Sequence, residues 1–438
     1  MIRKWMPLLA VSVFVGAGCE SKLTRTFSPE GAARERASGA SPVAMADEAP
    51  SGAEASGDGY RADIQAGLLT AGSFDDLADS RPYLDFVSGL SGGHVALLAA
   101  RCGSPPVVIH VETASGEPVP NAVVDVTGGS GRRLRLRTRT DGRCVVLRRW
   151  DGFDADERLG VIAQAGGRAG EGAIAQGQTR CVLQLPGASA ERPDRLDLAF
   201  VVDCTGSMTD ELEYLKVEIR GIAEEISRRF PRVRQRYALV AYRDEGDEYV
   251  TRVFNMDSLD AFVRDLGRQS AGGGGDYPEA VHRALQSAGQ LGWGEAHTTR
   301  VAFHVADAPP HDNRAGEALE ALTPLRERAV AVYPVAASGV GDAAEFVMRT
   351  EALLTGGQYL FLTDDSGVGN PHAEPHFPHY HVQTLRDVMV RMVASELSGE
   401  RLAPDPDRII RTVAPQAGGQ DDPAPAVEGP APAVSDGA

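Results

Sequence analysis

The second half of the chain alternates short apolar runs with longer amphipathic segments, and this alternation limits the fold more than any other feature. Residues 198–202 form a continuous apolar run, as expected for a strand buried on both faces of a parallel sheet. The next apolar residues are spaced by three and four positions: Leu212, Leu215, Ile219, Ile222 and Ile226. This spacing predicts a helix that packs one face against the sheet.

The same alternation continues over residues 194–398. Further strands are predicted at residues 237–242, 250–254, 301–306, 329–335 and 359–362. Helices are predicted near residues 259–266, 279–288, 315–328, 343–354 and 382–397. We therefore expect an α/β domain with a doubly wound, mostly parallel, Rossmann-like sheet. Its ligand site should lie at the carboxyl ends of the strands.

Oxygen-bearing side chains occupy three of the turns expected at those ends. Asp203, Thr205 and Ser207 follow the first strand, and a spacing of two lets a tight loop turn all three inward. Asp276 follows four glycines that open a helix, and Asp307 follows the strand at 301–306. Carboxylate and hydroxyl oxygens suit Mg²⁺, with Mn²⁺ or Ca²⁺ as alternatives. These five residues are the predicted metal ligands.

The segments DCTGSM at 203–208, GGGGDYPE at 272–279 and DAPPH at 307–311 together resemble a von Willebrand factor type A (VWA) domain. The resemblance covers residues 194–397 and implies a metal-ion-dependent adhesion site, whose open coordination position takes a carboxylate from a partner protein. Asp276 departs from the better-known threonine at its position. Three carboxylates against a divalent ion predict modest attraction for a guest acid.

Two more polar residues lie near the predicted site. Asp244 ends the second strand at the same edge, and His311 follows Asp307 by four positions. Both are candidates for contact with a metal-bound water. A strand-end turn for Asp244 and an ordinary loop histidine for His311 are the alternatives, and the sequence leaves them open.

Residues 105–187 have a period of two and turn signals such as Asp141-Gly142, which predict a small antiparallel β-sandwich. The stretch 107–147, with SGEPVPNAVVDV and then TDGRC, resembles the prealbumin-like sandwiches of carboxypeptidase regulatory and surface-adhesin modules. That resemblance implies a spacer or docking role. Arg133, Arg135, Arg137 and Arg139 form a basic stripe, which is either a solvated strand face or a surface for an anionic envelope polymer.

The amino terminus predicts secretion and lipid anchoring. Arg3 and Lys4 precede an apolar stretch at 8–15 that is too short to span a bilayer, so residues 1–18 are expected to be a signal peptide. The small residues before Cys19 resemble the lipobox of bacterial lipoproteins, which implies lipidation of Cys19. Gly16 departs from the usual leucine, and an ordinary signal with an incidental cysteine is the alternative. Glu20 favours the outer membrane or periplasm over the inner membrane.

The remaining segments are less specific. Residues 19–59 and 399–438 are rich in Ala, Gly, Ser and Pro, and we expect a flexible linker and a disordered tail. Residues 60–104 have no clear type. Four cysteines besides Cys19 can pair in three ways; Cys144 and Cys181 share one predicted domain, which favours their pairing over those that involve Cys102 or Cys204.

These observations predict a function and exclude others. A net charge of −17 argues against nucleic-acid binding. The sequence has no metalloprotease, nucleophile-elbow or P-loop motif, so we expect no enzyme. The preferred hypothesis is a lipoprotein of the cell envelope, anchored outside the cytoplasm, that captures a protein partner through a divalent cation. The alternatives are a structural lipoprotein that binds anionic polymer through its arginine stripe, and a metal-dependent hydrolase.

Overall fold

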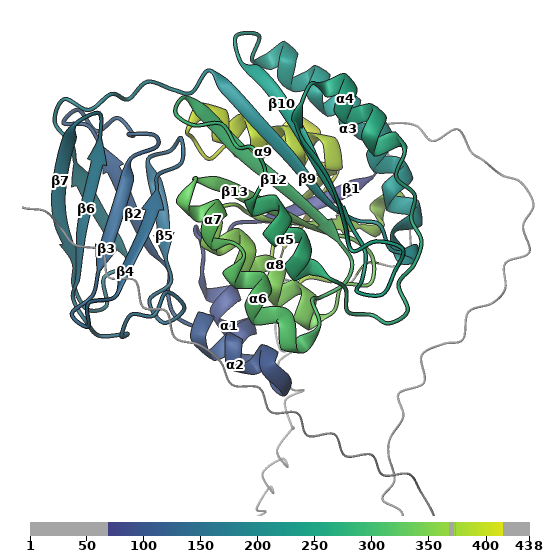
Figure 1. Cartoon of the computed structure of the whole chain (residues 1–438), viewed down its shortest axis with the longest axis horizontal. Coiled ribbons are helices and arrows are strands. Elements are labelled where there is room, and N and C mark those ends of the chain that lie inside the picture. Colours follow the sequence, from purple (N-terminus) through teal and green to yellow (C-terminus); the bar gives the residue numbers. More distant parts are fainter. Residues whose placement is uncertain (1–68, 368–371, 373, 415–438) are drawn as a thin grey trace, which may run out of the picture. The chain divides into compact units, whose positions relative to one another are not determined.

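The predicted parallel sheet forms the centre of the larger part of the molecule (Figure 1). The computed structural model describes residues 69–367, 372 and 374–414, so the predicted signal peptide, Cys19 and the linker lie outside the described residues. The five central strands are parallel, in the order β10 (Arg234–Tyr242), β9 (Arg195–Asp203), β12 (Thr298–Ala306), β13 (Val330–Ala336) and β14 (Tyr359–Thr363). The predicted fold class is confirmed.

Antiparallel strands extend this sheet on both sides. Strand β11 (Thr251–Asp257) borders β10, and β1 (Thr70–Phe74), β15 (Tyr380–Thr384) and β16 (Arg411–Val413) follow β14 in that order. The segment without a clear type therefore supplies an internal strand of the main sheet. Residues 399–414, expected to belong to a disordered tail, instead contain η4 (Pro406–Arg408) and β16.

Helices cover both faces of the sheet, as a doubly wound fold requires. One face packs against α3 (Thr209–Arg229), α4 (Leu259–Gly267) and α9 (Leu385–Ser398). The other face packs against α1 (Arg81–Gly89), α2 (Gly93–Cys102), α5 (Val281–Gly289), α6 (Ala315–Glu320), α7 (Thr323–Glu327) and α8 (Asp342–Thr355). The helix predicted at 315–328 is two helices, and Pro324 lies in the first turn of the second, where a proline is tolerated. None of the helices in the described part of the chain has the length and apolar character to span a membrane.

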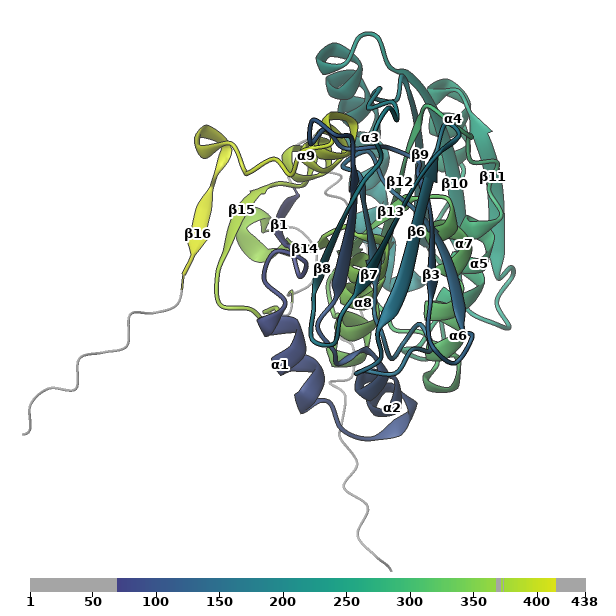
Figure 2. The same ribbon diagram turned by 90° about the vertical axis from the view of Figure 1, so that its left-hand side faces the viewer.

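Residues 107–184 form two small sheets that enclose one core (Figure 2). The first contains β5 (Arg143–Val146), β2 (Val107–Glu112) and β8 (Arg180–Gln184). The second contains β4 (Arg133–Arg137), β3 (Val123–Thr127), β6 (Leu159–Ala165) and β7 (Arg168–Ile174). Alternate residues of β2 are buried, which explains the period of two. The prealbumin-like relationship stays a prediction.

The expected pairing of Cys144 with Cys181 is wrong. Cys102, Cys144, Cys181 and Cys204 are all free and buried. Cys144 on β5 and Cys181 on β8 are both register partners of Ile109, which lies on the strand between them. Two strand spacings amount to about 10 Å, which is beyond the reach of a disulfide bond.

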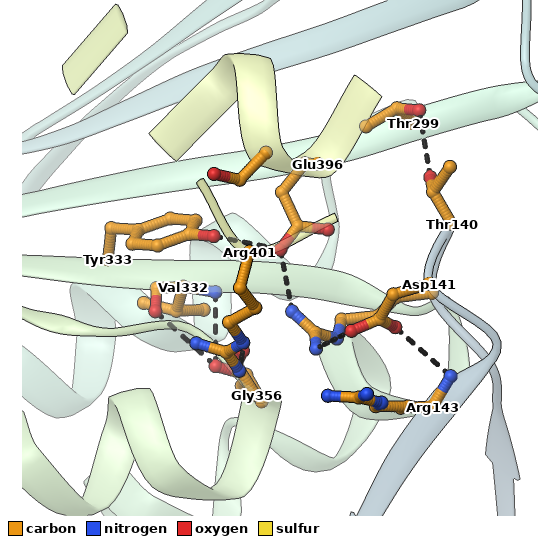
Figure 3. A network of polar contacts seen from close by, with 12 residues as sticks. Thr140, Asp141, Arg143, Thr299, Val332, Tyr333, Gly356, Glu396 and Arg401 are labelled. Atoms are coloured by element: carbon orange, nitrogen blue, oxygen red, sulfur yellow. Dashed lines mark hydrogen bonds and ion pairs between the residues drawn. The ribbon is translucent and has the colours of Figure 1, made fainter. Parts of the chain in front are cut away.

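The small sheets contact the main sheet at the edge where the parallel strands begin, which we call the amino edge. Arg139 donates to Glu396 at 2.6 Å and to Asp141 at 2.7 Å. Tyr333 also donates to Glu396, at 2.8 Å (Figure 3). Thr140 and Thr299 share a hydrogen bond of 3.1 Å beside it. Buried, charge-assisted contacts of this kind fix the register of the two parts.

The arginine stripe is not a uniform exposed face. Arg133 is exposed, but Arg135 makes a two-point ion pair with Asp125, with N···O distances of 2.7 and 3.0 Å. Arg137 is half-buried, and Arg139 belongs to the amino-edge network. The basic charge available to an anionic polymer is therefore smaller than the sequence suggested.

Candidate metal centre

The first predicted loop is a tight turn at the end of β9, at the edge where the parallel strands end, which we call the carboxyl edge. Asp203 is fully buried, and its Oδ1 accepts hydrogen bonds from the Thr205 amide at 2.9 Å and the Thr205 hydroxyl at 2.7 Å. The Thr205 and Ser207 hydroxyls are 3.3 Å apart. Because α3 begins directly after η1 (Gly206–Met208), the turn has little freedom to open.

Asp307 approaches this turn from the end of β12. Its side chain is buried, which raises its pKa, while the nearby Ser207 hydroxyl acts in the opposite direction; its Oδ1 has no partner. Asp203 Oδ2 is also buried without a partner. The structure therefore brings together four of the five predicted ligands: Asp203, Thr205, Ser207 and Asp307.

Asp276 does not join them. The glycine loop itself is in place, because the Gly272 amide donates to Cys204 at 3.0 Å and the Gly206 amide donates to Gly273 at 3.3 Å. Asp276 is exposed, and no hydrogen bond or ion pair between described residues involves its side chain. Its role as a ligand stays a prediction without a supporting contact.

Glu279 is the acidic residue of this loop that lies within the buried cluster, and the sequence analysis did not select it. Its side chain is 3% exposed and its Oε2 has no partner. Burial, reinforced by the charges of Asp203, Asp244 and Asp307, raises its pKa to about 9. An acid at a helix start is common, because it complements the helix dipole, so the sequence carried no decisive signal.

Asp244 and His311 contact each other, with 2.8 Å between Asp244 Oδ1 and His311 Nε2. Nearby, Asp247 accepts hydrogen bonds from the amides of Asp244 at 3.2 Å and Gly274 at 3.0 Å. These contacts hold the second strand end against the glycine loop. The expected contact of Asp244 or His311 with a metal-bound water stays a prediction.

The electrostatics of the site are those of an uncompensated acidic cluster. Burial, together with the negative charge of Asp307, raises the pKa of Asp203 to about 7. Asp203, Glu279 and Asp307 each have a buried oxygen without a partner, and none of the three forms an ion pair within the described part of the chain. Such carboxyl groups are costly to ionise unless a cation accompanies them.

The donor set suits a hard divalent cation, provided that hydroxyl groups and water take part. Among the described residues, no three His, Cys, Asp or Glu side chains are grouped closely enough to hold a metal ion by themselves. The hydroxyls of Thr205 and Ser207 are therefore essential to any such site. Mg²⁺ usually keeps several waters and takes only one or two carboxylates from the protein, which agrees with this composition.

A parallel sheet with polar side chains at its carboxyl edge is typical of a broad class of α/β domains. Comparison with known families identifies which domain of this class the chain contains. Residues 197–356 match the von Willebrand factor A domain. The match runs from β9 to the end of α8 and includes every residue of the candidate metal centre. The chain therefore contains a VWA domain.

The relatives match part of this chain and a small part of their own length. The human von Willebrand factor A domain-containing protein 7 is 32% identical over 179 residues, which is 38% of this chain and 19% of that protein. The alpha-protein kinase vwkA of Dictyostelium discoideum is 33% identical over 119 residues, or 26% of this chain and 19% of the kinase. The chain thus spans less than a fifth of either relative's length. Among solved structures, BatB from Bacteroides thetaiotaomicron is 11% identical, with a TM-score of 0.32 over 47% of this chain and 98% of that one.

Proposed function

We propose that this protein captures a protein partner through a divalent cation at the carboxyl edge of its VWA domain. The cation is Mg²⁺ in first place, with Mn²⁺ or Ca²⁺ as alternatives. A VWA domain indicates a role in protein interaction or adhesion, and the metal-dependent form of that role is our proposal. The observation that carries it is the set of buried carboxylate oxygens on Asp203 and Asp307 that lack partners beside the Thr205 and Ser207 hydroxyls.

Each residue would have a distinct part in cation binding. Thr205 fixes the Asp203 carboxylate through two hydrogen bonds to Oδ1, which leaves Oδ2 free. Ser207 is the exposed member of the set, so its hydroxyl faces the side from which a partner approaches. When bound, the cation would supply a coordination position for a carboxylate oxygen of the partner.

We further propose that the protein is a lipoprotein, anchored through Cys19 outside the cytoplasm, in the outer membrane or periplasm. The support is the sequence of residues 1–20, which lies outside the described residues. Metabolic labelling with a fatty acid tests it directly. Label should enter the wild-type protein but not Cys19→Ser, and labelling of both would refute the anchor.

The capture proposal is tested by a pull-down from cell-envelope extract with the full chain, read out by mass spectrometry. Partner retention should require Mg²⁺ and should be lost in EDTA and in Asp203→Ala. Asp260→Ala is the matched control, because Asp260 is an exposed carboxylate at the start of α4, which follows the end of β11 toward the amino edge of the sheet. Retention that is unaffected by EDTA and by Asp203→Ala would refute capture through a cation.

The same experiment separates the alternatives. Retention that is independent of metal but lost when Arg133, Arg135 and Arg137 are replaced would support a structural lipoprotein that binds anionic polymer. Turnover of ester, peptide or phosphate substrates would support a hydrolase. We propose that the protein is not an enzyme, since Ser207 is accounted for as a cation ligand and has no histidine partner among its contacts within the described residues.

A further inference from the structure

We propose that Glu279, and not Asp276, is the acidic ligand that the glycine loop contributes to the metal centre. This inference rests on the proposed function, since it assigns a residue to the same site. It changes the composition of that site: a residue absent from the predicted ligand set becomes part of it, and Asp276 takes another role.

The Glu279 carboxyl group is buried and has no hydrogen-bond partner at Oε2. Glu279 is 3% exposed, and its Oε2 has neither solvent nor a hydrogen-bond partner. A buried carboxyl group needs a partner whether it is ionised or protonated, because the protonated form has a hydroxyl to donate. Asp203 Oδ2 and Asp307 Oδ1 are in the same condition. A cation that one or two of these groups coordinate directly, with the third reached through a metal-bound water, would satisfy all three.

The backbone also joins Glu279 to the loop that follows Asp307. The Glu279 amide donates to Pro309 at 2.9 Å, and Glu279 pairs with Pro310 in a parallel bridge. The loop that begins at Asp307 is therefore joined directly to Glu279. This bridge fixes the position of Glu279 relative to Asp307 before any cation binds.

Gly274 leaves space beside the Glu279 carboxylate. This residue has φ of +72°, and a Cβ atom there would lie 3.1 Å from Glu279 Oε1 and 3.3 Å from the Cβ of Thr205. Glycine thus leaves room for the Glu279 carboxylate and the Thr205 side chain to lie on the same side of the loop. Both groups border the place where the cation is proposed.

Asp276 has none of these features. It is exposed, and the next residue is fixed elsewhere: the Tyr277 hydroxyl donates to Gly339 at 2.9 Å and accepts from the Gly341 amide at 2.8 Å. These contacts attach that part of the loop to the turn between β13 and α8. Asp276 is therefore available to contact a bound partner, and we assign it to capture rather than to cation binding.

The test is a Mn²⁺ titration of the full chain by calorimetry, with the isosteric variants Glu279→Gln and Asp276→Asn and with Asp260→Asn as the control. Glu279→Gln should weaken Mn²⁺ binding at least about tenfold, while Asp276→Asn and Asp260→Asn change it less than about threefold. Asp276→Asn should weaken partner retention in the pull-down even though it binds Mn²⁺.

Folding is checked separately. Circular dichroism and thermal unfolding should show that apo Glu279→Gln is folded, since the change removes an ionisable group from a buried place. Glu279→Asp is the second variant: it keeps the charge but withdraws it by one methylene, and it should also lose Mn²⁺ affinity.

The outcomes separate this inference from the proposed function. If Asp276→Asn abolishes Mn²⁺ binding while both Glu279 variants retain it, the inference is overturned and the predicted ligand set stands. If Glu279→Gln no longer binds Mn²⁺ but partner retention by the wild type is unaffected by EDTA, the inference stands and the proposal of capture through the cation is refuted. If the wild-type chain takes up no Mn²⁺, both are overturned.

Discussion

Replacement of Asp203 by asparagine should have opposite effects on the metal-free and the metal-bound protein. The amide oxygen introduced by Asp203→Asn would still accept both hydrogen bonds that Thr205 donates to Oδ1. The amide NH₂ takes the place of Oδ2, which has no partner, and offers a donor to Asp307, whose charge disfavours ionisation of Asp203. The apo variant should therefore be more stable than the apo wild type at neutral pH.

The magnitude follows from the pKa of Asp203, which burial and Asp307 raise from an ordinary 3.8 to about 7. Between these two pH values the folded state holds a proton that the unfolded state has lost, so wild-type stability falls as pH rises. The penalty is nearly absent below pH 4, about 2 kcal/mol at pH 5 and about 4 kcal/mol above pH 7, where it levels off. Asparagine does not titrate and escapes this penalty.

Urea denaturation in EDTA at pH 5 and pH 8 measures the effect. The advantage of Asp203→Asn over wild type should grow by about 2–3 kcal/mol between the two pH values, while Asp260→Asn shows no such growth. Mg²⁺ at about one hundred times its dissociation constant should then stabilise the wild type by about 2.7 kcal/mol and leave Asp203→Asn unchanged. A variant that is less stable than wild type at pH 8 in EDTA, or an advantage that does not change with pH, would refute the electrostatic account of the site.

Three further predictions concern the framework. Arg139→Met leaves Glu396 buried without its cation and should lower the free energy of unfolding by about 3–5 kcal/mol in urea; a loss below about 1 kcal/mol would show that the amino-edge network is not stabilising. Gly357→Ala places a Cβ atom in a steric clash with the Val332 carbonyl oxygen and should lower the melting temperature, with a cost of about 1–3 kcal/mol; an unchanged melting temperature would contradict this packing. The four buried cysteines should resist a thiol reagent in the native protein and react fully in denaturant. A protein mass lower by two hydrogens than that of the fully reduced chain would instead reveal a disulfide bond.

Much of the fold could be predicted because the relevant signals are local. The apolar run at 198–202 identified β9, and the helical spacing that follows it identified α3. Strands β1, β15 and β16 were missed, and the first residues of the helix predicted at 382–397 belong to β15. Each of these strands is short and gains its place only by pairing with residues far away in the chain. Pairing of this kind leaves no periodic pattern in the strand itself.

The candidate site could likewise be predicted where its residues share one turn, but not where they come from separate loops. Asp203, Thr205 and Ser207 lie in one turn, so their convergence follows from sequence spacing alone. Asp276 and Glu279 are both acids near the start of one helix, and spacing cannot tell which is buried. The parallel bridge from Glu279 to Pro310 decides this, and its partner belongs to another loop.

Among the described residues, buried acids have arginine partners at the amino edge of the sheet but not at the carboxyl edge. This contrast supports an external cation at the carboxyl edge. Buried carboxylates where the small sheets meet the main domain have arginine partners: Glu396 pairs with Arg139 at 2.6 Å, and Asp151 with Arg326 at 2.7 Å. A chain with 44 lysine and arginine residues has the means to neutralise acids internally. At the carboxyl edge, Asp203 and its two acidic neighbours form no ion pair within the described part of the chain and keep oxygens without partners. Since an unpaired buried acid destabilises the fold, its retention at this edge is explained if a divalent cation from solution completes the site.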